Sequence, residues 1–213
     1  MIDTIIFDMD GTLIDTEKYY RKCWPLALAA FGFEMSDEQA LSMRSLGRPF
    51  SPIYMKEMFG ETVDYHKVRE KRKELVEECI KENGIQLKTG VIELLQWLKE
   101  HNIRTAIATA TDMERTNRYL KMLGIHEYFD KLISATMVKE GKPSPDIYLY
   151  ACEQMERKPE ECIAVEDSPN GVLSAYRAGC KVVLVPDQTP AEDYLQDKLF
   201  ACVDSLTDIK ALL

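Results

Sequence analysis

The pattern that most limits the fold of this chain is an alternation of short apolar runs with segments of helical periodicity. The apolar runs lie at residues 5–7, 105–109, 131–134, 162–165 and 181–185, and a helical segment precedes each of the last four. Short apolar strands that alternate with helices are typical of a parallel sheet covered by helices on both faces. The sequence therefore predicts an α/β fold.

The first apolar run is separated from the others by a block with only helical patterns. Helices are predicted over 16–30, from 37 to about 46, from Pro52 to about 59, and over 64–83. In the first of them, Tyr19, Cys23 and Leu26 are expected to share one face. We therefore predict an α/β core of residues 1–15 and 84–213, with residues 16–83 as an inserted α-helical cap domain.

Charge and composition exclude several classes of partner. The 27 basic and 36 acidic residues give a net charge of −9, which makes a nucleic acid or an anionic membrane an unfavourable partner. No apolar run approaches the roughly 18 residues of a membrane span. The six cysteines are widely spaced, and Asp3 interrupts any apolar signal segment. We expect a cytoplasmic protein with reduced thiols, and a monomer as the default state.

The first apolar run ends abruptly in two acidic residues, Asp8 and Asp10. Side chains alternate along a strand, so the two carboxylates point the same way and repel each other. Such a pair is stable if a cation lies between the two, or if one is a reactive group and the other its acid–base partner. Gly11 allows a tight turn at this point. A plain surface turn is the alternative.

Polar side chains also follow the next apolar runs, at Thr109, at Lys142 and at Glu166-Asp167. In an open parallel sheet, ligands bind at the carboxyl ends of the strands, where these residues are expected to meet. Taken singly, Thr109 could be a helix cap, Lys142 a solvated loop charge, and the acidic pair a polar loop. Their convergence with the two aspartates indicates a functional site.

The same segments resemble the four motifs of the haloacid dehalogenase (HAD) superfamily in order and spacing. The matching segments are Asp8-Met9-Asp10-Gly11-Thr12, Thr109, Lys142-Pro143-Ser144-Pro145-Asp146 and Val165-Glu166-Asp167-Ser168. The helical insert is similar to that of the β-phosphoglucomutase-like and phosphoglycolate-phosphatase-like branch. The resemblance implies a Rossmann-like parallel sheet core and a phosphoryl-transfer enzyme.

The resemblance also implies a role for each core residue. Asp8 would attack phosphorus and form an aspartyl-phosphate, and Asp10 would act as general acid and then general base. Thr109 and Lys142 would hold the remaining phosphoryl oxygens. Ionised carboxylate and phosphate repel each other, so a divalent cation is needed.

Mg²⁺ is the expected cofactor, because it prefers hard oxygen ligands and accepts substrate phosphate among them. Asp8, the backbone carbonyl of Asp10, and Asp167 would supply the protein ligands. Glu166 is a further metal candidate that lies less directly at the ion.

Two departures narrow the reaction. Dehalogenases of the superfamily lack an acid at the position of Asp10, so its presence favours phosphoryl chemistry. β-Phosphoglucomutase has a histidine where this chain has Tyr20, and cations where it has Leu46 and Phe50 around Gly47. We therefore expect hydrolysis of a small phosphate monoester, such as a sugar phosphate. A sugar-phosphate mutase is the alternative, and a non-catalytic binding protein on the same fold is a third hypothesis.

The cap and the hinge are expected to supply the contacts that select the small phosphorylated metabolite. The candidate substrate-binding residues are Thr16, Tyr20, Arg44, Gly47, Arg48 and Ala110.

Overall fold

A six-stranded parallel sheet forms the centre of the molecule, as seen in a computed structural model that describes residues 2–213. The strand order is β3-β2-β1-β4-β5-β6, and every paired neighbour is parallel. The strands are β1 (Thr4–Phe7), β2 (Arg104–Thr109), β3 (Lys131–Ser134), β4 (Cys162–Glu166), β5 (Lys181–Leu184) and β6 (Ala201–Cys202). This confirms the predicted α/β fold and places β1 between β2 and β4.

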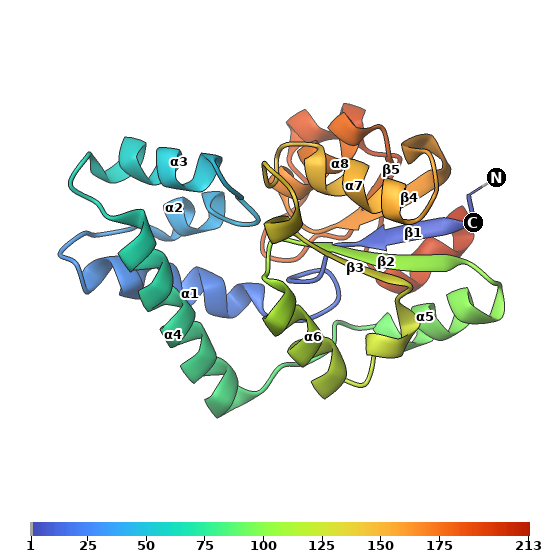
Figure 1. Ribbon diagram of the computed structural model, residues 1–213, viewed down its shortest axis with the longest axis horizontal. Helices are drawn as coiled ribbons and strands as arrows, with labels where there is room; N and C mark the ends of the chain where they lie inside the picture. Colours follow the sequence, from blue (N-terminus) through green and yellow to red (C-terminus); the bar gives the residue numbers. More distant parts are fainter. Residues whose placement is uncertain (1) are drawn as a thin grey trace.

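Helices cover both faces of the sheet (Figure 1). On one face lie α5 (Val91–Glu100) and α6 (Met113–Met122), and on the other lie α7 (Asp146–Gln154) and α8 (Pro169–Ala178). The alternation along β1 explains the two layers: Ile5 and Phe7 belong to the first apolar cluster, whereas Ile6 belongs to the second. The strands are buried on both sides, which is why they read as continuous apolar runs.

Residues 16–83, which we call the cap, contain helices and no strand. Its helices are α1 (Glu17–Ala29), α2 (Asp37–Ser42), α3 (Phe50–Phe59) and α4 (Tyr65–Asn83). They lie to one side of the sheet in Figure 1 and enclose a separate apolar cluster that includes Trp24, Leu28 and Met55. The division into cap and core domains at residues 15 and 84 stays a prediction.

One expectation about the cap is wrong. Leu26 was expected on the buried face of α1 with Tyr19 and Cys23, but it is 48% exposed. The helix instead buries the Trp24 side because it packs against α4 while also turning one side toward the core.

Several short elements lie outside the sequence-based expectations. Strand β6 has two residues, and short 3₁₀ helices occur at His126–Tyr128, Ala135–Met137, Pro159–Glu161, Asp193–Lys198 and Leu206–Leu212. Across residues 2–213, no helix combines the length and the apolar character that crossing a bilayer would require.

Core packing beneath the sheet sets the stability on which the site depends. We expect Leu94→Ala to lower the free energy of unfolding by about 2–5 kcal/mol, because Leu94 on α5 is fully buried and its removal leaves a cavity. Leu149→Ala on α7 is the matched control, since that leucine is 45% exposed. Chemical denaturation of both variants measures the difference, and equal losses would contradict this account of the core.

Candidate active site

The polar residues that follow β1, β3 and β4 meet at the carboxyl edge of the sheet. The Lys142 ammonium donates to Asp8 at 2.5 Å and to Glu166 at 2.6 Å. The backbone N–H of Asp8 donates to Val165 at 2.9 Å, so the first aspartate continues the β1–β4 ladder. The strand ends therefore bring together an acid from β1, an ammonium from a loop, and an acid from β4.

Lys142 is fixed from several sides although it is only 1% exposed. Burial would lower the pKa of Lys142, but the charges of Asp8 and Glu166 outweigh it and raise the pKa. Glu166 is held in turn by the Tyr148 hydroxyl at 2.6 Å and by Ser168 at 3.4 Å. Glu166 is thus already occupied, and this arrangement favours a role in orienting the lysine over direct contact with a metal.

Asp8, Glu166 and Asp167 form a buried acidic cluster whose carboxylate oxygens lie within 4.8 Å of one another. Within residues 2–213, Asp8 Oδ2 and both carboxylate oxygens of Asp167 are buried without a hydrogen-bond partner. Arg44 Nε approaches Asp167 only to 3.9 Å. Unpartnered buried carboxylates are costly, and oxygen donors of this kind are the ligands that hard divalent cations prefer. The residues present therefore fit a divalent cation between Asp8 and Asp167.

Burial raises the pKa of Asp8 well above its usual range; Lys142 opposes the shift, and neighbouring carboxylates add to it. Burial likewise raises the pKa of Asp167, with Arg44 opposing and Glu17 adding to the shift. Both shifts have the same origin, which is negative charge placed out of reach of water.

Gly11 is required by the close approach of two strand ends. Its φ is +86°, and a Cβ at this position would lie 2.5 Å from Asp167 Oδ2. The glycine thus allows the turn after β1 to pass directly beside the acid that follows β4. The predicted tight turn is present.

Asp10 is oriented by three hydroxyl groups. Thr16 donates to one carboxylate oxygen at 2.6 Å, while Thr111 and Thr109 donate to the other at 2.7 and 3.4 Å. Thr109 therefore lies within contact of Asp10 at the end of β2. Thr16 is fully buried and supports Asp10, and it is not among the residues that line the cavity.

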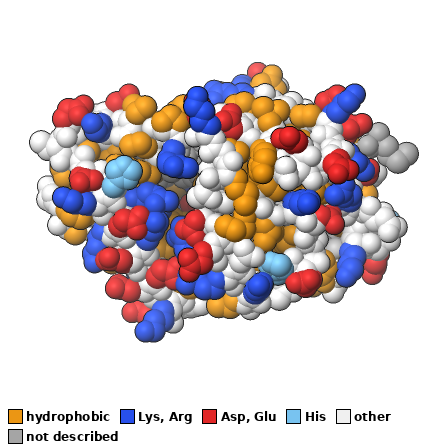
Figure 2. Space-filling view, viewed as in Figure 1, with side chains coloured by type: hydrophobic (Ala, Val, Ile, Leu, Met, Phe, Trp, Pro, Cys, Tyr) orange, Lys and Arg blue, Asp and Glu red, His pale blue; other side chains and the backbone are white. Residues whose placement is uncertain are grey.

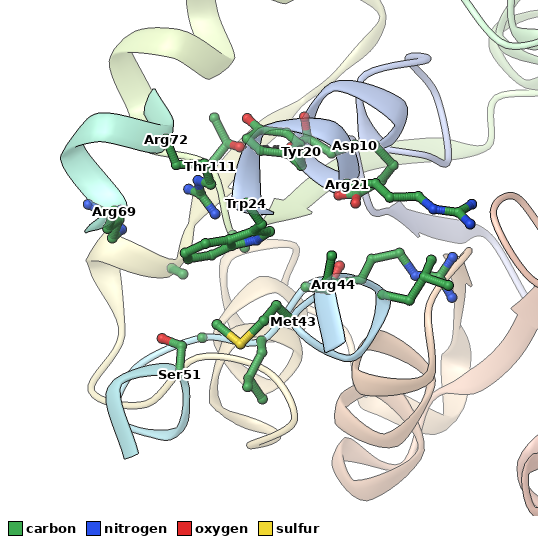
Figure 3. Close-up of a pocket in the computed structure, with 18 of the residues that line it drawn as sticks. Asp10, Tyr20, Arg21, Trp24, Met43, Arg44, Ser51, Arg69, Arg72 and Thr111 are labelled. Atoms are coloured by element: carbon green, nitrogen blue, oxygen red, sulfur yellow. Dashed lines mark hydrogen bonds between the residues drawn. The ribbon is translucent and has the colours of Figure 1, made fainter. Parts of the chain in front are cut away.

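A cavity between the cap and the core contains the reactive end of this site (Figure 3). Asp8 and Asp10 lie on its core side. Of the predicted substrate-binding residues, those that line it are Tyr20, Arg44, Gly47, Arg48 and Ala110. The lining residues that the sequence-based prediction missed include the charged side chains of Glu17, Arg69, Arg72 and Arg115. Arg115 carried a usable signal, because it lies in the first turn of α6, the helix that follows β2.

Glu17 is a buried acid that no motif identified. Glu17 is 7% exposed. Burial and the charge of Asp10 raise the pKa of Glu17, while the charge of Arg44 acts to lower it. The residue immediately follows Thr16 at the start of α1. The sequence pattern predicts only the start of a helix here, and it does not indicate that the Glu17 side chain lines the cavity.

The cap is docked onto the core by backbone contacts next to Lys142. Gly47 N–H donates to the Lys142 carbonyl at 2.7 Å, and Gly141 N–H donates to the Arg48 carbonyl at 2.6 Å. A Cβ on Gly47 would lie 2.6 Å from the Gly141 Cα, so the two loops approach as closely as glycine permits. Asn170 adds a side-chain contact to the Arg44 carbonyl at 2.9 Å.

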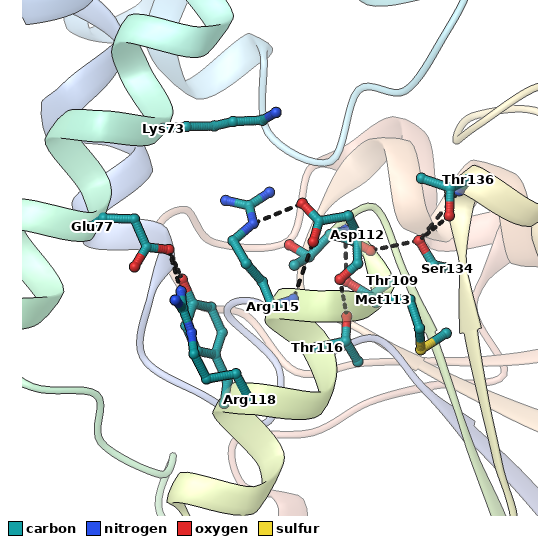
Figure 4. A network of polar contacts seen from close by, with 12 residues as sticks. Lys73, Glu77, Thr109, Asp112, Met113, Arg115, Thr116, Arg118, Ser134 and Thr136 are labelled. Carbon is teal, nitrogen blue, oxygen red and sulfur yellow. Dashed lines mark hydrogen bonds and ion pairs between the residues drawn. The ribbon is translucent and has the colours of Figure 1, made fainter.

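A polar network surrounds the turn after β2 (Figure 4). Asp112 caps α6 by accepting from the Arg115 backbone at 3.1 Å and also contacts its Nε at 2.9 Å. Ser134 on β3 donates to the Thr111 carbonyl at 2.7 Å, and Glu77 on α4 accepts from the Tyr119 hydroxyl at 2.8 Å. The turn that positions Thr109 and Thr111 is thus held by both the sheet and the cap.

Comparison with known proteins gives one consistent family. The sequence pattern of the haloacid dehalogenase-like hydrolases matches residues 2–179. A phosphorylated carbohydrates phosphatase of Thermotoga maritima is 33% identical over 100% of this chain and 90% of its own length.

Solved structures agree. A CbbY variant from Rhodobacter sphaeroides in complex with xylulose 1,5-bisphosphate is 27% identical, with a TM-score of 0.80 over 96% of this chain and 95% of its own. A β-phosphoglucomutase from Clostridium difficile is 25% identical, with a TM-score of 0.82 over 99% and 96%.

Because the pKa of Asp167 is raised in the folded protein, the thermal stability of the metal-free protein should depend on pH. An acid whose pKa is raised by folding stabilises the protein below its unfolded pKa of about 3.9, and this contribution is lost as the pH rises through the folded pKa. We therefore expect Asp167→Asn to unfold at a higher temperature than the wild type in EDTA at pH 8. The gap should narrow toward pH 4.

Thermal unfolding across this pH range measures the effect, with Asp204→Asn on the surface as the control. A metal-free wild type that is more stable than Asp167→Asn at pH 8 would contradict it.

Proposed function

This chain belongs to the haloacid dehalogenase-like hydrolase family, and we propose that it is a Mg²⁺-dependent phosphatase that acts through an aspartyl-phosphate. Its substrate is a small phosphate monoester such as a sugar phosphate. The observation that carries the proposal is the environment of Asp8, whose one oxygen contacts Lys142 while the other is buried without a partner among residues 2–213. An acid placed in this way can present an oxygen to phosphorus.

Asp8, the Asp10 carbonyl and Asp167 would hold the cation, and the orphaned oxygens of the two aspartate side chains support this assignment. When bound, Mg²⁺ neutralises negative charge on the nucleophile and on the phosphoryl oxygens. Lys142 supplies a second positive charge at Asp8 Oδ1, and Glu166 keeps it in place.

In the first half of the reaction, a carboxylate oxygen of Asp8 forms a bond to phosphorus. The bond between phosphorus and the ester oxygen breaks, and its electron pair stays on the leaving oxygen. Asp10 donates a proton to that oxygen, so the alcohol departs neutral. Thr109 and Lys142 bind the remaining phosphoryl oxygens.

In the second half, a water molecule attacks the phosphorus of the aspartyl-phosphate. Asp10, which is now ionised, accepts the proton of this water. The bond between phosphorus and the Asp8 oxygen breaks, so that inorganic phosphate leaves and both aspartates return to their initial states. The hydroxyls of Thr16 and Thr111 keep Asp10 aimed through both steps.

The docked cap supports a closed reaction space. Its loop residues Gly47 and Arg48 bond to the loop that carries Lys142, so closing the cap also positions this lysine. Closure of this kind limits bulk water and commits the substrate to reaction. The relatives support the substrate class, because one is a phosphorylated carbohydrates phosphatase and another binds a sugar bisphosphate.

A mutase is the second candidate, favoured by the structural likeness to a β-phosphoglucomutase. In a mutase, the phosphoryl group of the aspartyl-phosphate is transferred to a hydroxyl group of the substrate, whereas in a phosphatase it is transferred to water. Tyr20 lines the cavity at the position where the sequence resemblance places a histidine in β-phosphoglucomutase. Its hydroxyl is buried without a partner among the described residues, and it supplies no cation for a second orientation of substrate. Hydrolysis therefore remains the first proposal.

Loss of the nucleophile or of the metal should abolish turnover. We expect Asp8→Asn to lower phosphate release from a panel of sugar phosphates by roughly 10³-fold or more, since the amide cannot form the intermediate. EDTA should do the same to the wild type, with recovery on adding Mg²⁺. Asp15→Asn is the matched control because its carboxylate pairs with Lys18 at the surface. Normal release by Asp8→Asn would overturn the mechanism.

The products distinguish phosphatase from mutase. We expect β-glucose 1-phosphate, incubated with Mg²⁺ and a trace of glucose bisphosphate primer, to yield no more glucose 6-phosphate than hydrolysis of the primer itself can supply, because water is the acceptor in hydrolysis. Phosphorus NMR resolves these species in one sample. Glucose 6-phosphate forming faster than inorganic phosphate would establish the mutase.

A further inference from the structure

Three arginines, two from the cap and one from the core, line the cavity that contains Asp8 and Asp10. Arg69 and Arg72 come from α4 of the cap, and Arg115 comes from α6 of the core. Figure 3 shows Arg69 and Arg72 on the side of the cavity away from Arg44, with Tyr20 toward Asp10. In the space-filling view, Lys and Arg side chains border the hollow between cap and core (Figure 2). The mechanism proposed above gives none of the three a task.

The Arg72 guanidinium lies over two aromatic rings, and its Nε has no hydrogen-bond partner among the described residues. Its guanidinium carbon lies 4.3 Å from the Trp24 ring centroid and 5.0 Å from that of Tyr20. Its Nε is buried without a hydrogen-bond partner in the part of the chain that the structure describes. Stacking fixes the plane of a guanidinium while its N–H groups remain available in that plane.

Arg115 is a buried cation with one edge occupied. It is 8% exposed, and its Nε contacts Asp112 at 2.9 Å. Its Nη1 is buried and has no hydrogen-bond partner among residues 2–213. A buried donor without a partner costs free energy unless a ligand completes it.

The two guanidiniums line the same cavity. Burial lowers the pKa of Arg72, and the charge of Arg115 adds to the shift. In Figure 3, Tyr20 lies between Arg72 and Asp10, and its ring is the one that lies 5.0 Å from the Arg72 guanidinium carbon. Two cations in one cavity, each with a buried donor that lacks a partner among the described residues, form a site for an anion.

Arg44 belongs to the other end of the cavity. It lies 3.9 Å from Asp167 and donates to Thr189 at 3.0 Å. Its position near the acidic cluster separates it from the pair formed by Arg72 and Arg115.

We propose that Arg72 and Arg115, with Arg69 at the edge, bind a second anionic group of the substrate while its phosphate ester reacts at Asp8. The preferred substrate is therefore doubly anionic: a phosphate monoester that carries a second phosphate or a carboxylate. This inference rests on the proposed phosphatase activity and specifies its substrate class.

The test compares pairs of substrates that differ in the second anion. Fructose 1,6-bisphosphate against fructose 1-phosphate tests a phosphate, and 3-phosphoglycerate against glycerol 3-phosphate tests a carboxylate. We expect the wild type to show at least a 10-fold higher kcat/KM for the doubly anionic member of one pair. The pair in which this occurs identifies the second anion.

In that pair, Arg72→Gln and Arg115→Gln should each reduce the preference at least 10-fold. In each variant, the kcat/KM for the doubly anionic substrate should therefore fall at least 10-fold further than the kcat/KM for its singly anionic partner. Arg72→Lys keeps the charge and should retain part of the preference. Lys71→Gln on α4 and Lys121→Gln on α6 are the matched controls, because both lysines lie outside the cavity.

Two results would overturn the inference while leaving the phosphatase intact: equal kcat/KM for both members of each pair, or an equal loss on both members in the arginine variants. Absence of phosphate release from all four compounds and from the wider panel of sugar phosphates would instead overturn the proposed function. Thermal unfolding of each variant, together with its activity on the singly anionic partner, separates a folding defect from a loss of anion binding.

Discussion

The burial of Asp8 against Lys142 is the constraint on which the rest of the site depends. A carboxylate on the central strand has other acids around it, and burial makes its charge costly. Lys142 offsets part of this cost only because Glu166 and Asp8 hold it from two sides, and Tyr148 holds Glu166. The remaining imbalance is what a divalent cation would correct. A site that is electrostatically incomplete without metal and substrate is arranged for binding them.

The same lysine links the chemistry to the position of the cap. Its backbone carbonyl and the neighbouring Gly141 N–H bond to Gly47 and Arg48, so the loop that carries the counter-ion of Asp8 is also the docking surface of the cap. The contact is made through backbone atoms, and it depends on the absence of side chains at Gly47 and Gly141. The position of the cap is therefore linked to Lys142 through backbone atoms alone. Side-chain motifs in the sequence do not reveal such a link.

Much of the fold could be predicted, because strands buried on both faces give continuous apolar runs and parallel strands deliver their ends to one edge. These two rules were enough to bring Asp8, Thr109 and Lys142 together. They failed where local pattern and tertiary contact differ. Leu26 lies at helical spacing from Cys23, yet α1 has two packing partners and leaves that leucine exposed. Strand β6 has too few residues to leave a periodic signal.

The arginines of the cavity show the same limit at the level of function. Arg72 lies in a helix rich in Lys, Arg and Glu, and the sequence does not distinguish the charged residues that face solvent from those that face the cavity. Only the fold reveals that this one is stacked on Trp24 and turned inward. The placement matters because the whole chain carries a net charge of −9 and repels anionic metabolites. Cations gathered in a low-dielectric cleft make the electrostatic potential there more positive than it is over the rest of the surface, and so they attract anions to the cleft. An acidic protein can therefore select a highly charged substrate, provided that its positive charges are gathered inside the cavity.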